Sequence, residues 1–146
     1  MVQNPNRPVS PHLGVYKWGP HMAISIMHRA TAFVLATAGM MTLLWWLYSV
    51  ATGPEAYASF QSYVVSAGDG ATSWQTAANW FFRLLAVGVT WSFFQHFFSG
   101  IRHLLMDMGA GFELNTNKTW SLLVFVASVS ATGITALLVA SRYIGN

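Results

Sequence analysis

Three stretches of this sequence are long and apolar enough to cross a lipid bilayer, and they constrain the fold more than any other feature. They cover residues 22–50, 79–105 and 120–141. A helix needs about 20 predominantly apolar residues to cross the hydrocarbon core. Only 8% of the residues are charged, whereas soluble domains carry about 25%, and a lipid-facing surface explains that deficit. We therefore predict an all-α membrane protein whose three transmembrane helices form an antiparallel up-down bundle.

The segments outside these stretches fit a single membrane-anchor domain covering residues 1–146. Residues 1–20 are polar and rich in proline. They lack the apolar core of a secretory signal. We expect them to form a retained cytoplasmic segment of a bacterial protein.

The distribution of basic residues predicts how the chain is oriented in the membrane. Arg7 and Lys17 precede the first span, and Arg102 and Lys118 flank the second connection, whereas residues 51–78 contain no Lys or Arg. Cytoplasmic loops collect Lys and Arg. The sequence therefore predicts a multi-pass protein of the bacterial inner membrane with a cytoplasmic N-terminus.

Two features of the composition narrow the function. The chain has no cysteine, so it supplies no disulfide, no zinc–thiolate site and no thiolate ligand to an iron–sulfur cluster. The formal net charge is +3, but the basic residues are spread along the chain and form no patch of the kind that binds nucleic acid. We expect a lipid bilayer and protein subunits as partners, and no nucleic acid.

Ionisable residues are scarce in the predicted spans, yet five of them gather near one membrane surface: His28, Arg29, His96, Arg102 and His103. Arg at the centre of a membrane helix costs about 2.5–3.5 kcal/mol, so such residues usually face the protein interior and have a function. With a rise of 1.5 Å per residue, His28 lies about 12 Å beyond Pro20 and His96 about 16 Å before Asp107. Because the two helices are antiparallel neighbours, these side chains are expected to lie at a common level.

The spacing within the second span adds to this expectation. His96 and His103 are seven residues apart, so they lie on one face of a helix. Gly100 lies between them and leaves that face open to a flat macrocycle or to another helix. Asp107, four residues beyond His103, is placed to pair with His103 or with Arg102.

These residue types suit two ligands. Neutral imidazole is a good axial ligand of heme iron, and His28, Arg29 and His103 are placed to pair with heme propionates. The Ser25 hydroxyl and the Arg29 guanidinium can donate hydrogen bonds to a quinone. Two simpler interpretations remain: His96 makes a hydrogen bond between helices, or Arg29 extends to the lipid headgroups.

At this point two motifs resemble a known family. The segments RPVSPHL at residues 7–13 and SIMHRAT at residues 25–31 resemble the N-terminal signature of the cytochrome b subunit of succinate dehydrogenase. The segment HFFSGIRHLLMD at residues 96–107 resembles the second signature of that family, H-x-x-x-G-[IV]-R-H-[LM]-x-x-D. The motifs lie on the first and second of three spans, as the family pattern requires.

The resemblance implies a membrane anchor of succinate dehydrogenase, completed by a second small membrane-anchor subunit. It implies that the chain docks an iron–sulfur subunit and a flavoprotein subunit, shares a heme b, and forms part of a site that reduces ubiquinone. By position in the motifs, His96 matches the axial ligand of the heme iron, and Ser25 and Arg29 match quinone-binding residues. His28, Arg29 and His103 match residues near the heme propionates. The family implies no residue of this chain for the oxidation of succinate.

Three alternatives follow from the residues themselves. The chain can be a heme-free, quinone-binding anchor, or a small membrane transporter or assembly factor. Within a heme-binding anchor, the second axial ligand can be His28 instead of a residue of the partner. We predict that it comes from the partner, because residues 120–141 contain no histidine.

Overall fold

The computed structural model describes residues 12, 14 and 18–144, and every regular element in this part of the chain is a helix. The elements are α1 (Pro20–Val34), a π-helical turn η1 (Leu35–Gly39), α2 (Met40–Thr52), α3 (Pro54–Val64), α4 (Ser73–Asp107) and α5 (Leu114–Ile144). Apart from His12, the motif at residues 7–13 lies outside the described residues, as does most of the segment predicted to be cytoplasmic.

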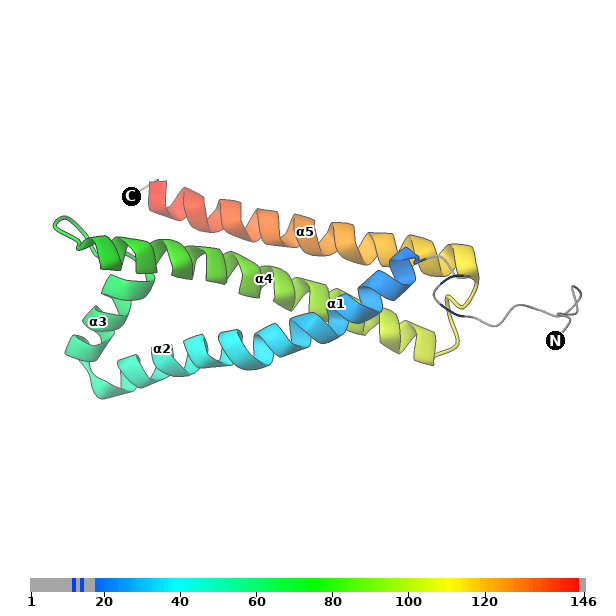
Figure 1. Ribbon diagram of the computed structural model, residues 1–146, viewed down its shortest axis with the longest axis horizontal. Coiled ribbons are helices and arrows are strands. Elements are labelled where there is room, and N and C mark those ends of the chain that lie inside the picture. Colours follow the sequence, from blue (N-terminus) through cyan, green and yellow to red (C-terminus); the bar gives the residue numbers. More distant parts are fainter. Residues whose placement is uncertain (1–11, 13, 15–17, 145–146) are drawn as a thin grey trace, which may run out of the picture.

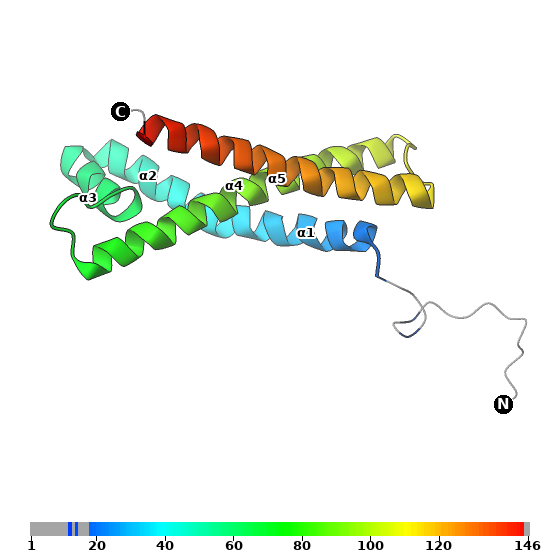
Figure 2. The ribbon, with the colours of Figure 1, turned by 90° about the horizontal axis from the view of Figure 1, so that it is seen from above.

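Within the described residues, three helical bodies are long and apolar enough to cross a membrane: Pro20–Thr52, Ser73–Asp107 and Leu114–Arg142. They lie side by side and alternate in direction (Figures 1 and 2). The predicted all-α fold with three spans is therefore confirmed. The end of the bundle at which α1 begins, α4 ends and α5 begins is called the α1 end below; the opposite end, which carries α3, is called the α3 end.

All three helical bodies begin before the predicted spans, and two of them begin six residues earlier. α4 starts at Ser73 because Thr72 caps it: the Thr72 hydroxyl accepts a hydrogen bond from the Gln75 backbone N–H at 3.3 Å, and Gln75 Oε1 accepts one from the Thr72 N–H at 3.0 Å. Such a reciprocal capping box satisfies two backbone donors at a helix start. α5 likewise starts at Leu114, six residues before the predicted span. Polar first turns extend the helices beyond the apolar stretches, so hydropathy places these boundaries too late.

The interior of the bundle is mostly polar. Among the described residues, the buried apolar side chains are Ile24, Phe60 and Val124, whereas Ser, Thr, Asn, Gln and Arg make up the rest of the buried set. Large apolar side chains such as Leu84, which is 72% exposed, face outward. Small hydroxyl residues let transmembrane helices approach closely and bond across their interface. The chain therefore places its apolar surface toward lipid and its polar groups between helices.

The contact between α4 and α5 is the most polar part of this interior. Buried residues on α4 recur every three or four positions, at Ser92, Gln95, Ser99 and Arg102, and form one stripe of the helix. Ser128 of α5 donates a hydrogen bond from its hydroxyl to Gln95 Oε1 at 2.6 Å. This stripe fixes which face of α4 is turned toward α5.

The π-helical turn divides the first span into two parts. A π turn adds a residue to the helical repeat and changes which face the following helix presents. Gly39, the last residue of the turn, lies close to α4, where a Cβ added to it would meet Val89 Cγ1 at 3.6 Å. The turn therefore separates α1, which carries His28, from α2, which packs on α3.

The short helix α3 packs across the end of the bundle opposite the α1 end. Gly53, with φ of 125°, makes the sharp change of direction from α2, and Pro54 begins the new helix. The Phe60 ring is buried against the edge of Trp45, with ring centroids 5.1 Å apart. Asn79 of α4 is buried against the C-terminal end of α3. The predicted connection 51–78 therefore includes an ordered helix that packs on the bundle.

Candidate functional site

Three imidazole rings lie together between α1 and α4. The His28 ring of α1 stacks on the His96 ring of α4, with centroids 4.2 Å apart and planes inclined by 4°. The His28 and His103 centroids are 4.8 Å apart, with planes inclined by 36°. All three side chains are half-buried. The structure thus brings together three of the residues that the sequence analysis assigned to one site.

Backbone carbonyl groups determine which ring nitrogens carry protons. His96 Nδ1 lies 3.1 Å from the backbone oxygen of His28, and His103 Nδ1 lies 2.7 Å from the backbone oxygen of Ser99. A carbonyl oxygen can only accept a hydrogen bond, so Nδ1 must donate in both rings. In the neutral form each ring then has its lone pair on Nε2, which is the state in which imidazole binds a metal.

The stacked pair cannot hold one metal ion between its two rings. The lone pair of an imidazole nitrogen lies in the ring plane, and the His28 and His96 rings lie face to face. Over the described residues, no group of three or more His, Asp or Glu side chains is arranged to hold a metal ion. A metal bound by His96 therefore needs ligands from outside this cluster.

Ser25 and Arg29 lie one helical turn apart on the same face of α1, next to His28. The Ser25 side chain is half-buried and the Arg29 side chain is exposed. Gly100 of α4 lies between His96 and His103, and a Cβ added there would meet nothing within 4 Å. The site therefore has donor groups at its edge and open space beside the two histidines of α4.

The expected pairing of Asp107 with Arg102 or His103 is wrong. Arg102 is buried and donates from Nη2 to Asn117 Oδ1 at 2.5 Å, while His103 is bonded to a backbone oxygen. Asp107 is exposed at the last position of α4. The reason is the rotation of α4, which turns Arg102 toward α5, where the early start of α5 supplies Asn117.

Sequence reasoning missed the buried polar residues Gln95 and Asn79 and the half-buried Asn117. Gln95 is fully buried, and its Nε2 has no hydrogen-bond partner in the described structure. The available signal was the spacing of Ser92, Gln95, Ser99 and Arg102, which places four polar side chains on one face of a membrane helix.

Comparison with known proteins agrees with these observations. Residues 3–135 match the model of the family described as succinate dehydrogenase/fumarate reductase transmembrane subunit. The chain is 31% identical to the succinate dehydrogenase cytochrome b556 subunit of Paracoccus denitrificans, over 94% of this chain and 95% of that protein. It is 30% identical to the corresponding subunit of Rickettsia felis, over 86% and 87%, and 31% identical to the mitochondrial cytochrome b560 subunit of Sus scrofa, over 90% and 72%. The three spans, the histidine cluster and these matches together show that the chain belongs to the family of succinate dehydrogenase/fumarate reductase transmembrane subunits.

Proposed function

We propose that this chain is the heme b-binding membrane anchor of a succinate:ubiquinone oxidoreductase. The observation that carries the proposal is the state of His96, which lies within a membrane span with Nδ1 bonded to a backbone oxygen and Nε2 left for iron. Relatives that match most of the chain are named cytochrome b subunits of succinate dehydrogenase. No residue of this chain is assigned to the oxidation of succinate.

The residues around His96 fit a heme. The position of Gly100 leaves open space on the face that His96 and His103 share, which suits the approach of a flat macrocycle. His28, Arg29 and His103 would pair with the propionates at the α1 end. When bound, heme b supplies a reversible one-electron couple at its iron. His96 would ligate the iron, and its Nδ1 hydrogen bond would keep the ring oriented and raise its basicity.

The second axial ligand is proposed to come from the partner membrane subunit. The rival is His28, but its ring is stacked flat on His96. The nitrogen lone pairs lie in the ring planes, so two rings stacked face to face do not direct their lone pairs at one metal ion. The stacked arrangement supports a role for His28 beside the heme and not as its second ligand.

Ser25 and Arg29 are proposed to bind ubiquinone. One turn of α1 separates them, so both can donate hydrogen bonds to the same ligand. The Arg29 guanidinium would also stabilise the negative charge that develops on the quinone oxygen during reduction. Its exposure is consistent with a contact that partner subunits complete.

The proposed function also assigns an orientation to the chain in the membrane. The α1 end is proposed to face the bacterial cytoplasm, where the iron–sulfur subunit docks with the flavoprotein subunit behind it. The absence of Lys and Arg from residues 51–78 supports a periplasmic position for the α3 end. The second small membrane subunit would cover part of the bundle.

The test is the reduced-minus-oxidised absorption spectrum of the purified complex, with its subunits identified. We expect co-purification with a flavoprotein and an iron–sulfur protein, and a sharp reduced α band of low-spin heme. His96→Ala should remove that band, whereas His28→Ala should keep it in an assembled complex. Absence of that band from the wild-type complex would favour the heme-free anchor, and an unchanged band in His96→Ala would contradict His96 as the iron ligand. Loss of the low-spin band in His28→Ala would favour ligation within this chain. A chain that co-purifies with no flavoprotein would favour a transporter or assembly factor.

A further inference from the structure

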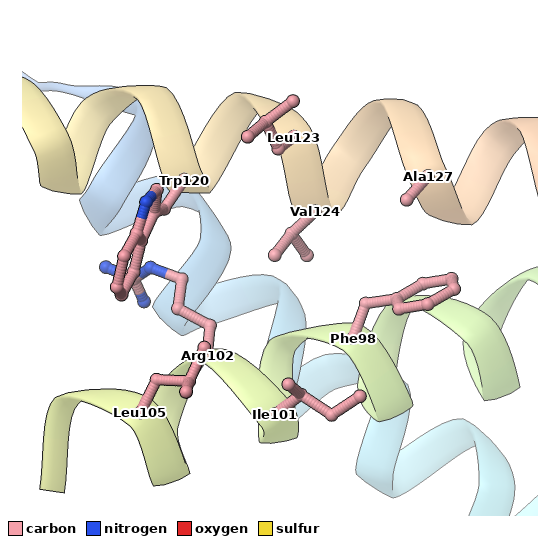
Figure 3. Close-up of a pocket in the computed structure, with 8 residues that line it drawn as sticks. All are labelled: Phe98, Ile101, Arg102, Leu105, Trp120, Leu123, Val124 and Ala127. Carbon is pink, nitrogen blue, oxygen red and sulfur yellow. The ribbon is translucent and has the colours of Figure 1, made fainter. Parts of the chain in front are cut away.

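A cavity of about 250 Å³ lies between α4 and α5 near the α1 end, on a different face of α4 from the histidine cluster. Figure 3 shows its walls, which come from both helices. The lining residues on which the inference depends are Phe98, Ile101 and Arg102 of α4 and Trp120, Leu123 and Ala127 of α5. Arg102 is the one charged side chain among the residues that line it.

Arg102 lacks a negative partner within the described residues. Its side chain is 6% exposed, its Nε is buried without a hydrogen-bond partner, and the oxygen that Nη2 contacts belongs to the neutral amide of Asn117. The nearest acidic residues along the chain, Asp107 and Glu113, are both exposed. A buried charge is costly unless it is paired. The guanidinium therefore requires an anion that this part of the chain does not provide.

The position of the cavity indicates where that anion comes from. Arg102 lies five residues before the end of α4, about 8 Å along the helix, and Trp120 lies six residues into α5, about 9 Å along it. That depth corresponds to the headgroup level of a bilayer, where Trp is enriched. The rim is apolar and exposed on this chain, since Ile101 is 40% and Leu123 is 59% exposed. Basic pockets between membrane helices at this level bind anionic headgroups.

We propose that this cavity binds an anionic phospholipid, with its phosphate paired to Arg102 and an acyl chain on the apolar wall formed by Phe98, Leu123 and Ala127. The volume of about 250 Å³ is large enough for a phosphodiester group beside Arg102. The inference depends on the membrane fold and does not require the heme or quinone assignment.

The experiment measures lipid that stays bound to the assembled complex through detergent washing, by native mass spectrometry and by phospholipid analysis. Arg102→Gln should reduce retained anionic lipid at least tenfold, and Arg102→Lys should keep most of it. Ala127→Phe fills the apolar wall without changing charge, and it should cause a similar loss. Asn117→Ala removes the neutral partner alone and should leave retention unchanged. Arg83→Gln is the matched control at the α3 end, where Arg83 is exposed.

Three results would overturn the proposal. Retention of anionic lipid at the wild-type level in both Arg102→Gln and Ala127→Phe would exclude a lipid site in this cavity. Retained lipid together with loss of heme or of a partner subunit in Arg102→Gln would assign the anion to a propionate or to a protein carboxylate. If the Arg102→Gln complex does not assemble, two other measurements test the proposal. These are lipid retention in Ala127→Phe and the stabilisation of the washed wild-type complex by added phosphatidylglycerol compared with phosphatidylcholine. Stabilisation of the washed wild-type complex by both lipids equally would also contradict an anion-specific site.

Discussion

The two ends of the bundle both bury polar groups, but they use them differently. At the α3 end, Asn79 donates to the backbone oxygens of Ser62 at 2.8 Å and Tyr63 at 2.6 Å, and its Oδ1 accepts from the Ala67 N–H at 3.0 Å. Toward the α1 end, Gln95 Nε2, Ser99 Oγ and Arg102 Nε are buried without partners in the described structure. A buried polar group that makes all its hydrogen bonds stabilises a fold, whereas a buried polar group without a partner is available to a ligand or subunit.

The two arginines repeat this contrast. Arg83 at the α3 end is exposed and contacts the backbone oxygen of Val65 at 3.5 Å. Arg102 at the α1 end is buried beside a cavity. An exposed arginine near a membrane surface keeps its charge solvated, but a buried one needs an anion. Between Arg83 and Arg102, burial and not residue type decides which guanidinium requires an anion.

The largest expected effect concerns the α1 end. His96→Ala should abolish the low-spin heme spectrum, because it removes the proposed iron ligand and no neighbouring ring is oriented to replace it. Asn79→Ala, the matched change at the α3 end, should leave heme content near that of the wild type. Heme per complex is measured by the reduced-minus-oxidised spectrum; equal heme loss in both variants would end the distinction between the two ends.

The second effect is on quinone chemistry. Arg29→Ala should lower succinate:ubiquinone reductase activity about 100-fold, the order found when a charge-stabilising donor is removed. Electron transfer from succinate to a soluble artificial acceptor should continue, since it does not use this chain. Arg83→Ala is the control and should retain quinone activity. Undiminished quinone reduction in Arg29→Ala would argue against the assigned site.

The third effect concerns the hydrogen bonds that Asn79 makes at the α3 end. Asn79→Ala removes three hydrogen bonds that join α4 to the end of α3, and it should destabilise the α3 end by about 1–3 kcal/mol. Hydrogen exchange of α3 amides measures the loss. Thr76→Ala, which removes one exposed bond to Thr72 O, should leave α3 protection unchanged. Full protection of α3 in Asn79→Ala would show that Phe60 packing alone holds this helix.

A smaller effect distinguishes two glycines in the connection at the α1 end. Both Gly109 and Gly111 have positive φ, of 88° and 78°, but a Cβ added to Gly111 would lie 2.5 Å from the Trp120 ring, whereas one added to Gly109 would meet nothing within 4 Å. Both alanine variants carry backbone strain of about 1 kcal/mol or more. Gly111→Ala should lower the thermal midpoint further, because Trp120 must also move.

The smallest effect lies in the polar stripe. Ser128→Ala removes the hydrogen bond to Gln95, and such bonds between membrane helices contribute about 0.6 kcal/mol on average. Detergent unfolding of the chain should show a loss of that size. Ser130→Ala, an exposed position on the same helix, should show none. A loss above about 2 kcal/mol would mean that Gln95 supports a larger polar network.

The resemblance at residues 25–31 and 96–107 predicted a cluster that includes His28, His96 and His103, and the antiparallel arrangement explains why these three rings lie together. Two neighbouring spans of known direction bring residues near the start of one and the end of the other to one level. The rotation of each helix about its axis could not be predicted, because it depends on packing against neighbours. That is why Asp107 was expected to pair with His103 or Arg102, whereas the partner of Arg102 is Asn117.

The sequence by itself determined that the chain crosses a membrane and that three of its stretches are long enough to do so. It also determined which scarce ionisable residues meet near one surface. These conclusions follow from the cost of polar groups in hydrocarbon. Tertiary structure alone decided which polar atoms are satisfied. The bond from His96 to the His28 backbone, the Asn79 contacts with α3 and the free Nε of Arg102 each depend on the angular position of a helix against its neighbour. Hydrogen bonds require an alignment of donor and acceptor that only packing supplies.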